Sequence, residues 1–214
     1  MMKHLKFFSL LMCCLMAGVL TSCVSDEESS DLTPTQRHQA FQQVSGSYSG
    51  KVMFYDASYS GNTMTTTNTV DTLDANFILL TDSTASISRL PIAALAHQVK
   101  DETLRNAMLK SSYDNTALSL VTYYYNVNPA ACQVAAKPLT LNLEYGGSTH
   151  QVTFVFYYGY SSAGFISYGM QNTKTGDFYV RLQLGGLKVD DQDMTSTMLF
   201  NDNVHGVLFF SGHR

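Results

Sequence analysis

Tyrosine is the residue type whose number and clustering suggest a binding surface. The chain has 13 tyrosines and no tryptophan, with runs at 123–125 and around 157–160. A flat ring with a polar tip suits the recognition of sugars or proteins. Alternation along a strand turns half of each run inward, where the rings would pack in the core. The candidate ligand surface consists of Tyr124, Tyr158 and Tyr160.

No segment matches a catalytic motif. Residues 159–164, GYSSAG, depart from the G-x-S-x-G pattern of a nucleophile elbow and lie between two predicted strands, which favours a simple loop. A glycan hydrolase needs two carboxylates facing each other across a cleft, yet outside the N-terminal segment the glutamates are only Glu102 and Glu144. We therefore predict no catalytic residue. A hydrolase of extracellular glycans remains the alternative function.

Metal and cofactor sites are also not expected. The histidines form neither an H-x-H pair nor an H-E-x-x-H motif. The acidic run 190–193 could offer oxygens to calcium, but it lacks the glycine and terminal glutamate of an EF-hand loop, which favours an acidic turn between strands. Cys132 is the only cysteine beyond residue 23, so it can form neither an intrachain disulfide in the mature chain nor a multi-cysteine zinc site.

The charge pattern argues against nucleic-acid binding. The formal net charge is −4, and the 13 lysines and arginines form no basic stripe. Charged residues are sparse, while serine, threonine, asparagine and tyrosine are abundant. This mixture is typical of exposed sheet surfaces in an extracellular β protein.

The N-terminus has the order of a secretory signal peptide. Lys3 and Lys6 precede an apolar run at 7–20, which is well short of the roughly 20 residues of a membrane-spanning helix. Residues 20–23, LTSC, resemble a bacterial lipobox, in which the cysteine is acylated and becomes the first mature residue. We predict a signal peptide at 1–22 and lipidation at Cys23.

An acidic, polar segment follows Cys23. It looks like the export signal that Bacteroidota place after the lipidated cysteine, and its residues are Ser25, Asp26, Glu27 and Glu28. Such a segment cannot bury enough apolar surface to fold, so 23–32 is expected to be a disordered tether. The predicted location is the outer membrane, by a lipid anchor at the cell surface. The expected partners are the membrane and an envelope protein or glycan.

Residues 33–214 are predicted to form a single β-rich domain. Thr33, Pro34 and Gln36 give the start signals of a helix over 34–44, namely an N-cap, a proline at the first position and a capping box. Helical spacing at 91–110 predicts one kinked helix or two short helices joined near Lys100. Period-two alternation predicts strands at 48–56, 64–74, 76–81, 84–89, 117–127, 164–170, 178–184 and 204–211.

A hairpin around Gly146 and Gly147 is predicted with its register. Alternating apolar residues on either side of this turn place Leu141, Leu143, Phe154 and Phe156 in the core. The fold class is therefore mainly β (α+β), an antiparallel sandwich or open barrel with a short N-terminal helix and a helical insert.

Three landmarks resemble a known family. They are the helix running into Gly46-Ser47-Tyr48-Ser49-Gly50, the helical insert that begins at Pro91, and Lys137-Pro138-Leu139 at the start of a strand. Together with the lipobox, they resemble the small Bacteroidota lipoproteins of domain-of-unknown-function family 4840. The resemblance implies an envelope location and a single domain, and no activity. We expect a lipid-anchored, non-catalytic binding protein.

The substitution Cys23→Ala tests the anchor. Acyl chains contribute about 0.8 kcal/mol per buried CH₂, so we expect the variant to leave the membrane fraction. Neutralising Asp26, Glu27 and Glu28 should instead keep the lipidated protein inside the cell. Cell fractionation and labelling with palmitate measure both effects, and a native chain that takes up no label would refute the lipoprotein interpretation.

Overall fold

The computed structural model describes residues 31–60, 63–113, 116–161, 164–199 and 206–214. The predicted signal peptide, Cys23 and the export signal lie outside these residues. Contacts within the segment Leu32–Arg214 make it one compact unit.

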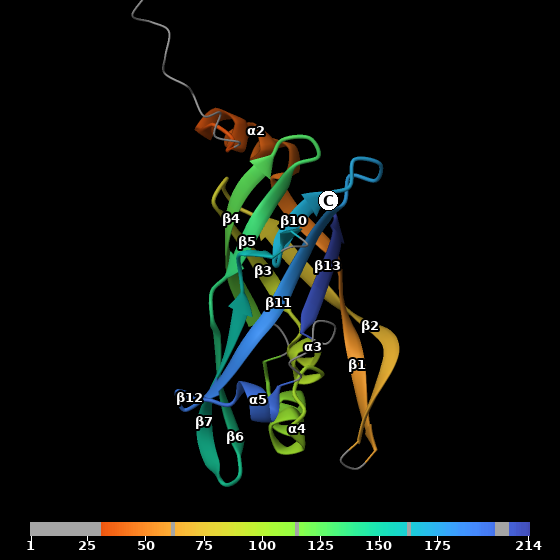
Figure 1. The fold of residues 1–214 in the computed structure, drawn as a ribbon, viewed down its shortest axis with the longest axis vertical. Coiled ribbons are helices and arrows are strands. Elements are labelled where there is room, and N and C mark those ends of the chain that lie inside the picture. Colours follow the sequence, from red (N-terminus) through yellow and green to blue (C-terminus); the bar gives the residue numbers. More distant parts are fainter. Residues whose placement is uncertain (1–30, 61–62, 114–115, 162–163, 200–205) are drawn as a thin grey trace, which may run out of the picture. The chain divides into compact units, whose positions relative to one another are not determined.

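Eight antiparallel strands close into a barrel, in the order β1, β2, β3, β4, β5, β10, β11, β13, with β13 pairing back to β1 (Figure 1). The predicted mainly β fold is confirmed, and the architecture is a barrel that is closed rather than open. Its strands are β1 (Gly46–Ser60), β2 (Thr63–Leu79), β3 (Thr84–Leu90), β4 (Thr116–Asn126), β5 (Ala131–Ala136), β10 (Tyr168–Gln171), β11 (Phe178–Val189) and β13 (Val207–His213).

Strand β11 also connects the barrel to a protruding hairpin. Its first residues pair with β10, and its second half, from Gln183 to Val189, pairs with β7. The hairpin consists of β6 (Leu139–Tyr145) and β7 (Ser148–Tyr157). Two small additions are β12 (Gln192–Asp193), which pairs with β11, and the separate pair of β8 (Tyr160–Ser161) and β9 (Gly164–Phe165).

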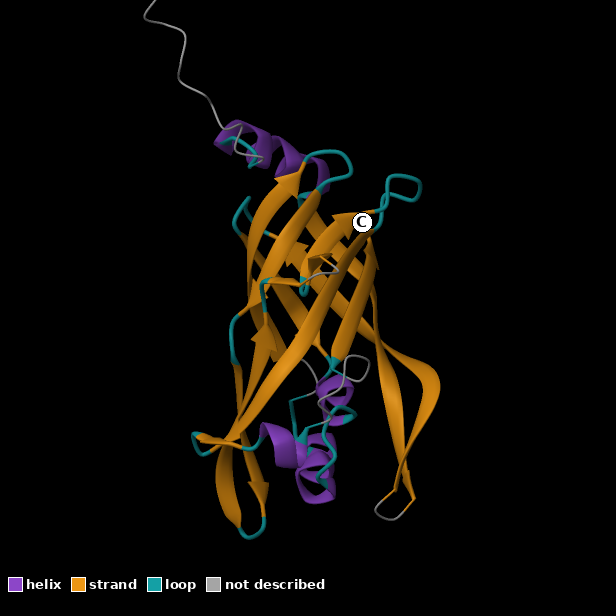
Figure 2. Cartoon of the chain, in the orientation of Figure 1, coloured by secondary structure: helices purple, strands orange, loops and turns teal. Residues whose placement is uncertain are grey.

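Helices lie at the two ends of the barrel (Figure 2). At one end is α2 (Pro34–Val44), whose predicted capping box is present: Thr33 accepts from the Gln36 N–H, and the Gln36 side chain accepts from the Thr33 N–H. At the other end are α3 (Ile92–Ala96), α4 (Glu102–Lys110) and α5 (Thr195–Met198). The predicted insert is thus two short helices, and Asp101 caps the second.

Side chains fill the barrel. The rings of Tyr48 and Phe77 stack at 4.8 Å between centroids, and the ring of Phe178 lies 6.2 Å from that of Phe77. Gly212 lies beneath the stack, where an added Cβ would be 2.7 Å from a carbon of Phe77. Gly169 similarly makes room for Phe178. An eight-stranded barrel is just wide enough for side chains to pack in this way.

Two predicted strand boundaries were wrong, and one strand was missed. The ranges 64–74 and 76–81 belong to one strand, β2, because Ala75 continues its inward alternation. The range 164–170 is divided between β9 and β10. Strand β5 was not predicted, since its sequence, ACQVAA, is poor in the β-branched and aromatic residues that mark strands.

The hairpin register yields a stability prediction. Phe154 is fully buried, whereas Thr153 points outward and its hydroxyl lies 3.0 Å from that of Thr140. We expect Phe154→Ala to lower the free energy of unfolding by about 3 to 5 kcal/mol, and Thr153→Ala by well under half of that. Denaturant melts measure the difference. Equal, small losses at the two positions would contradict the register.

Candidate functional site

The structure exposes two of the three tyrosines predicted for the ligand surface and buries the third. Tyr158 and Tyr160 are 68% and 73% exposed, as the prediction requires. Tyr124 is fully buried inside the barrel, where its ring packs edge-on against Phe41 of α2, so it cannot be part of an exposed surface. The alternation of β4 instead turns Tyr123 outward, with 42% of its surface exposed.

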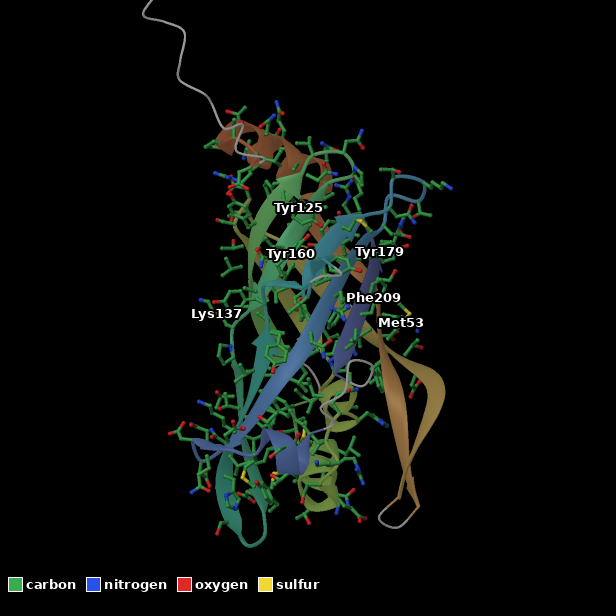
Figure 3. All side chains as sticks on the ribbon, viewed as in Figure 1. Met53, Tyr125, Lys137, Tyr160, Tyr179 and Phe209 are labelled. Atoms are coloured by element: carbon green, nitrogen blue, oxygen red, sulfur yellow. The ribbon has the colours of Figure 1, made fainter. Side chains whose placement is uncertain are left out.

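Outward-facing residues of six barrel strands form a continuous row on the barrel wall. Each residue is the cross-strand partner of the next, from β1 through β13, β11, β10 and β5 to β4: Met53, Phe209, Arg181, Tyr168, Gln133 and Tyr123. Tyr179 and Met170 lie directly beside this row as partners of each other. These eight residues are called the barrel-wall stripe. Figure 3 labels Tyr179, Phe209 and Met53 on β11, β13 and β1.

The central side chains of the stripe are held in place. The rings of Tyr179 and Phe209 stack with centroids 5.5 Å apart and an interplanar angle of 26°. Asn172 donates a hydrogen bond of 3.2 Å to the Tyr179 hydroxyl. Arg181 donates to the carbonyl of Ile166 and to the side chain of Gln183. A surface fixed in this way loses little conformational entropy when a partner binds.

The composition of the stripe differs from that of another exposed sheet face of the same molecule. Where β6 and β7 pair, the outward residues of the hairpin are all polar and mostly exposed, whereas Val155 and Tyr157 follow them on the same face of β7: the polar ones are Thr140, Asn142, Glu144, Thr149, Gln151 and Thr153. Six of the eight stripe residues are aromatic or methionine, and none is acidic or a lysine. Tyr123 and Met170 are exposed, and the other six residues of the stripe are half-buried.

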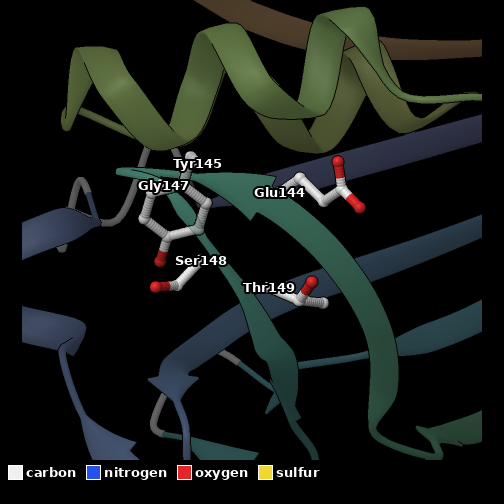
Figure 4. A pocket seen from close by; sticks show the side chains of 5 residues that line it. All are labelled: Glu144, Tyr145, Gly147, Ser148 and Thr149. Atoms are coloured by element: carbon white, nitrogen blue, oxygen red, sulfur yellow. The ribbon is translucent and has the colours of Figure 1, made fainter.

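A polar depression of about 420 Å³ lies at the tip of the hairpin, lined by Glu144, Tyr145, Gly147, Ser148 and Thr149 (Figure 4). Nearby, the His150 ring lies 4.4 Å from that of Tyr145, and its Nδ1 is 2.7 Å from a carboxylate oxygen of Asp190. Among the described contacts, no hydrogen bond joins Ser148 to His150. The groups of a Ser–His–Asp triad are therefore present near the tip but are not linked as catalysis requires.

The first two residues of the acidic run 190–193 form the predicted turn between β11 and β12, and the last two form β12. Asp190 and Asp191 have positive φ angles of 49° and 63°. The Asp190 carboxylate accepts from the Gln151 backbone N–H as well as from His150, and these bonds hold the pKa of Asp190 below its usual range. Within the described residues, no group of three or more potential ligands could hold a metal ion.

Cys132 is a free cysteine and is buried. Burial raises the pKa of its thiol to about 12, so the reactive thiolate does not form at neutral pH. The helices in the described part of the chain are all too short or too polar to cross a membrane.

Comparison with known proteins gives one match. The family model described as "Domain of unknown function (DUF4840)" matches residues 43–189, which is more than half of the chain. The matched segment runs from the end of α2 to the end of β11 and stops before β13. Neither a curated protein nor a solved structure matches.

The His150–Asp190 contact predicts an acid-dependent stability. Because the pKa of Asp190 is lowered in the folded state, its stabilisation is complete above the unfolded pKa of about 3.9 and is lost as pH falls through the folded value. We expect Asp190→Asn to lower the melting temperature at neutral pH and to lessen the further decrease below about pH 4. Thermal melts across this range measure both, and two parallel curves would contradict the expectation.

Proposed function

We propose that this chain, which belongs to the domain-of-unknown-function family DUF4840, is a lipid-anchored, non-catalytic binding protein of the Bacteroidota cell surface. Its partner would be another envelope protein that docks on the barrel-wall stripe. The lipobox ending at Cys23 and the acidic residues behind it support the location. The continuous row of outward residues across six strands, rich in aromatic side chains and methionine, carries the proposal of docking.

The filled barrel directs binding to the outer surface. Barrels of eight strands that carry small ligands hold them in an interior cavity. Here the space is occupied by the stacked rings of Tyr48 and Phe77 and by Phe178. Each end is also covered by helices. A carrier function would therefore require displacement of the core, whereas an outer surface is available without rearrangement.

The stripe suits a protein better than a glycan. Protein interfaces are enriched in aromatic residues, methionine and arginine, and depleted in lysine, aspartate and glutamate, which is the composition of the stripe. The Arg181 guanidinium is fixed at its centre by Ile166 and Gln183. The complementary surface would be apolar, with a carboxylate facing Arg181. A glycan would instead favour a surface richer in hydrogen-bonding groups.

The two glutamates of the described residues do not form the pair that a glycan hydrolase needs. Glu102 begins α4, and Glu144 lines a depression with Lys110, which ends it. The two glutamates thus lie near opposite ends of a nine-residue helix, which spans about 13 Å. Paired carboxylates of glycosidases are roughly 5 to 9.5 Å apart.

Site-specific photo-crosslinking in intact cells tests the docking surface. A photoreactive residue placed at Met170 or Phe209 should yield the same discrete adduct with one envelope protein. Arg181→Gln should reduce that adduct at least about tenfold, because it removes the charge at the centre of the interface. Thermal melts confirm that the variant remains folded.

The matched control carries the photoreactive residue at Thr140, on the polar outer face of the hairpin. We expect no adduct with that envelope protein there. Adducts with it in equal yield at Thr140 and Phe209, or different partners at Met170 and Phe209, would contradict a single docking surface. Retardation of the native protein by a polysaccharide in affinity electrophoresis, abolished by the stripe variants, would identify a glycan as the partner instead.

A further inference from the structure

Strand β6 of the protruding hairpin has an open edge. It pairs with β7 on one side, and no strand in the described part of the chain pairs with its other side. Helix α4 lies beside the hairpin (Figure 1). The backbone N–H and C=O groups along an open edge are free to pair with a strand from another chain, so β6 is a candidate site for such pairing.

The turn of the hairpin determines which backbone groups face the open side. Gly146 and Gly147 have φ angles of 60° and 84°, and positive values at both positions define a two-residue type I′ turn. Tyr145 and Ser148, which flank this turn, therefore form a hydrogen-bonded pair. Alternation from that pair directs the backbone groups of three residues of β6 away from β7. They are Thr140, Asn142 and Glu144.

Strand β7 supports this phase of the hydrogen bonds. Gln151, the cross-strand partner of Asn142, donates its N–H to the Asp190 carboxylate, and its carbonyl accepts from the Asp190 N–H, each at 2.9 Å. Both backbone groups of Gln151 thus point away from β6. The backbone groups of Thr140, Asn142 and Glu144 have no hydrogen-bond partner among the described residues. These three residues form the unpaired row of the edge.

Strand β6 lacks the features by which proteins commonly block an open edge. The range Leu139–Tyr145 contains no proline and no lysine, and its register with β7 continues without a bulge. Thr140, Asn142 and Glu144 are all exposed. The edge is therefore regular and accessible over its whole length.

A groove lies beside this edge. It has a volume of about 400 Å³ and separates the second half of β6 from the C-terminal end of α4, with Asn142, Leu143 and Glu144 on one wall and Ala107, Lys110 and Tyr113 among the residues of the other. Helix α4 therefore leaves the edge open and stands across the groove from it. A single extended segment fits between these walls, whereas a second copy of the chain would bring its own β7 against α4.

The two faces of the hairpin select the side chains of such a segment. Side chains of an added strand alternate between the faces of the sheet. On the face of the buried Leu141 and Leu143, the neighbouring wall of α4 favours apolar residues. On the exposed face, polar residues are favoured, and the carboxylate of Glu144 favours a cation directly opposite. Lys110, on the other wall, disfavours further cations.

We propose that β6 binds an extended segment of a partner protein by antiparallel strand addition. The segment alternates apolar and polar residues and places a lysine or arginine opposite Glu144. Main-chain hydrogen bonds to the unpaired row hold it, and the alternating side chains give specificity. The site shares no residue with the barrel-wall stripe and does not depend on it.

A designed peptide, Thr-Val-Lys-Val-Thr-Val-Thr with a fluorescein label at its N-terminus, tests the proposal. Its lysine lies opposite Glu144 when its last threonine lies opposite Thr140. The peptide is titrated with the full chain in detergent solution, and fluorescence anisotropy reports binding. We expect binding below millimolar concentrations, and binding at least about threefold weaker when glutamate replaces the lysine.

Methylation of the peptide backbone distinguishes strand addition from contacts made by side chains alone. Methyl groups on the nitrogens of the lysine and of the threonine two residues after it remove N–H groups that would face β6. We expect this peptide to bind at least about tenfold more weakly than its parent. Methyl groups on the second and third valines remove N–H groups that face away from β6, and they should weaken binding far less.

Amide hydrogen exchange locates the bound segment. In the free chain, the amides of Thr140, Asn142 and Glu144 should exchange rapidly because they have no partner. The peptide should slow their exchange at least about tenfold. The amides of Leu141 and Leu143 bond to β7 already, so their exchange should change little.

Asn142→Pro is the decisive variant because it removes an N–H that has no partner in the free protein. Proline is tolerated on an edge strand at such a position, so we expect the melting temperature to stay near the native value while peptide binding falls at least about tenfold. Asn142→Thr, the matched control, changes only the side chain and should bind as the native chain does. Glu144→Gln should remove the preference for lysine over glutamate, and it provides a second test if Asn142→Pro does not fold.

Four results would overturn the proposal. They are the failure of the lysine peptide to bind at millimolar concentrations, native affinity in Asn142→Pro, equal weakening by the two methylated peptides, and an unchanged preference for lysine in Glu144→Gln. Dimers of the free chain in analytical ultracentrifugation, with the edge amides already protected, would show that a second copy occupies β6 and would likewise refute a peptide partner. The crosslinks at Met170 and Phe209 do not depend on any of these results.

Discussion

The packing of Tyr48, Phe77 and Phe178 inside a closed barrel is the constraint on which the rest of the structure depends. These rings fit because Gly212 and Gly169 have no side chains to meet them. The Tyr48 hydroxyl also donates to the Val44 carbonyl at 2.7 Å, which fixes the end of α2 to the barrel. One aromatic cluster thus fills the interior and positions the covering helix.

A filled interior determines where recognition can occur. Alternation along each strand sends one set of aromatic residues to this core and the other set to the wall. The same alternation that buries Val180 and Phe210 therefore exposes their neighbours Tyr179 and Phe209 on the outside. The barrel-wall stripe is thus a consequence of how the barrel closes.

Local signals made part of this fold predictable. The capping box of α2, the Asp101 cap and the Gly146–Gly147 turn each act within a few residues, and the structure contains all three. Closure depends on the pairing of β13 with β1, far apart in sequence, and no short pattern encodes that pairing. Strand β5 was missed for a related reason. Its alternation is too short to indicate a strand, and its pairing with β4 and β10 is what places it in the sheet.

The candidate sites were harder to predict than the fold. A run of three tyrosines has two possible phases, and only the register of β4 shows that Tyr123, rather than Tyr124, faces outward.

Hydrogen exchange of the β13 backbone amides tests the closed barrel most directly. Because β13 lies between β1 and β11, its amides should exchange only when the whole domain unfolds, at the same free energy as the amides of β4 between β3 and β5. Residue-by-residue NMR under native conditions measures both strands. Exchange of β13 at a clearly lower free energy than β4 would show that the barrel opens at this seam and would contradict the account.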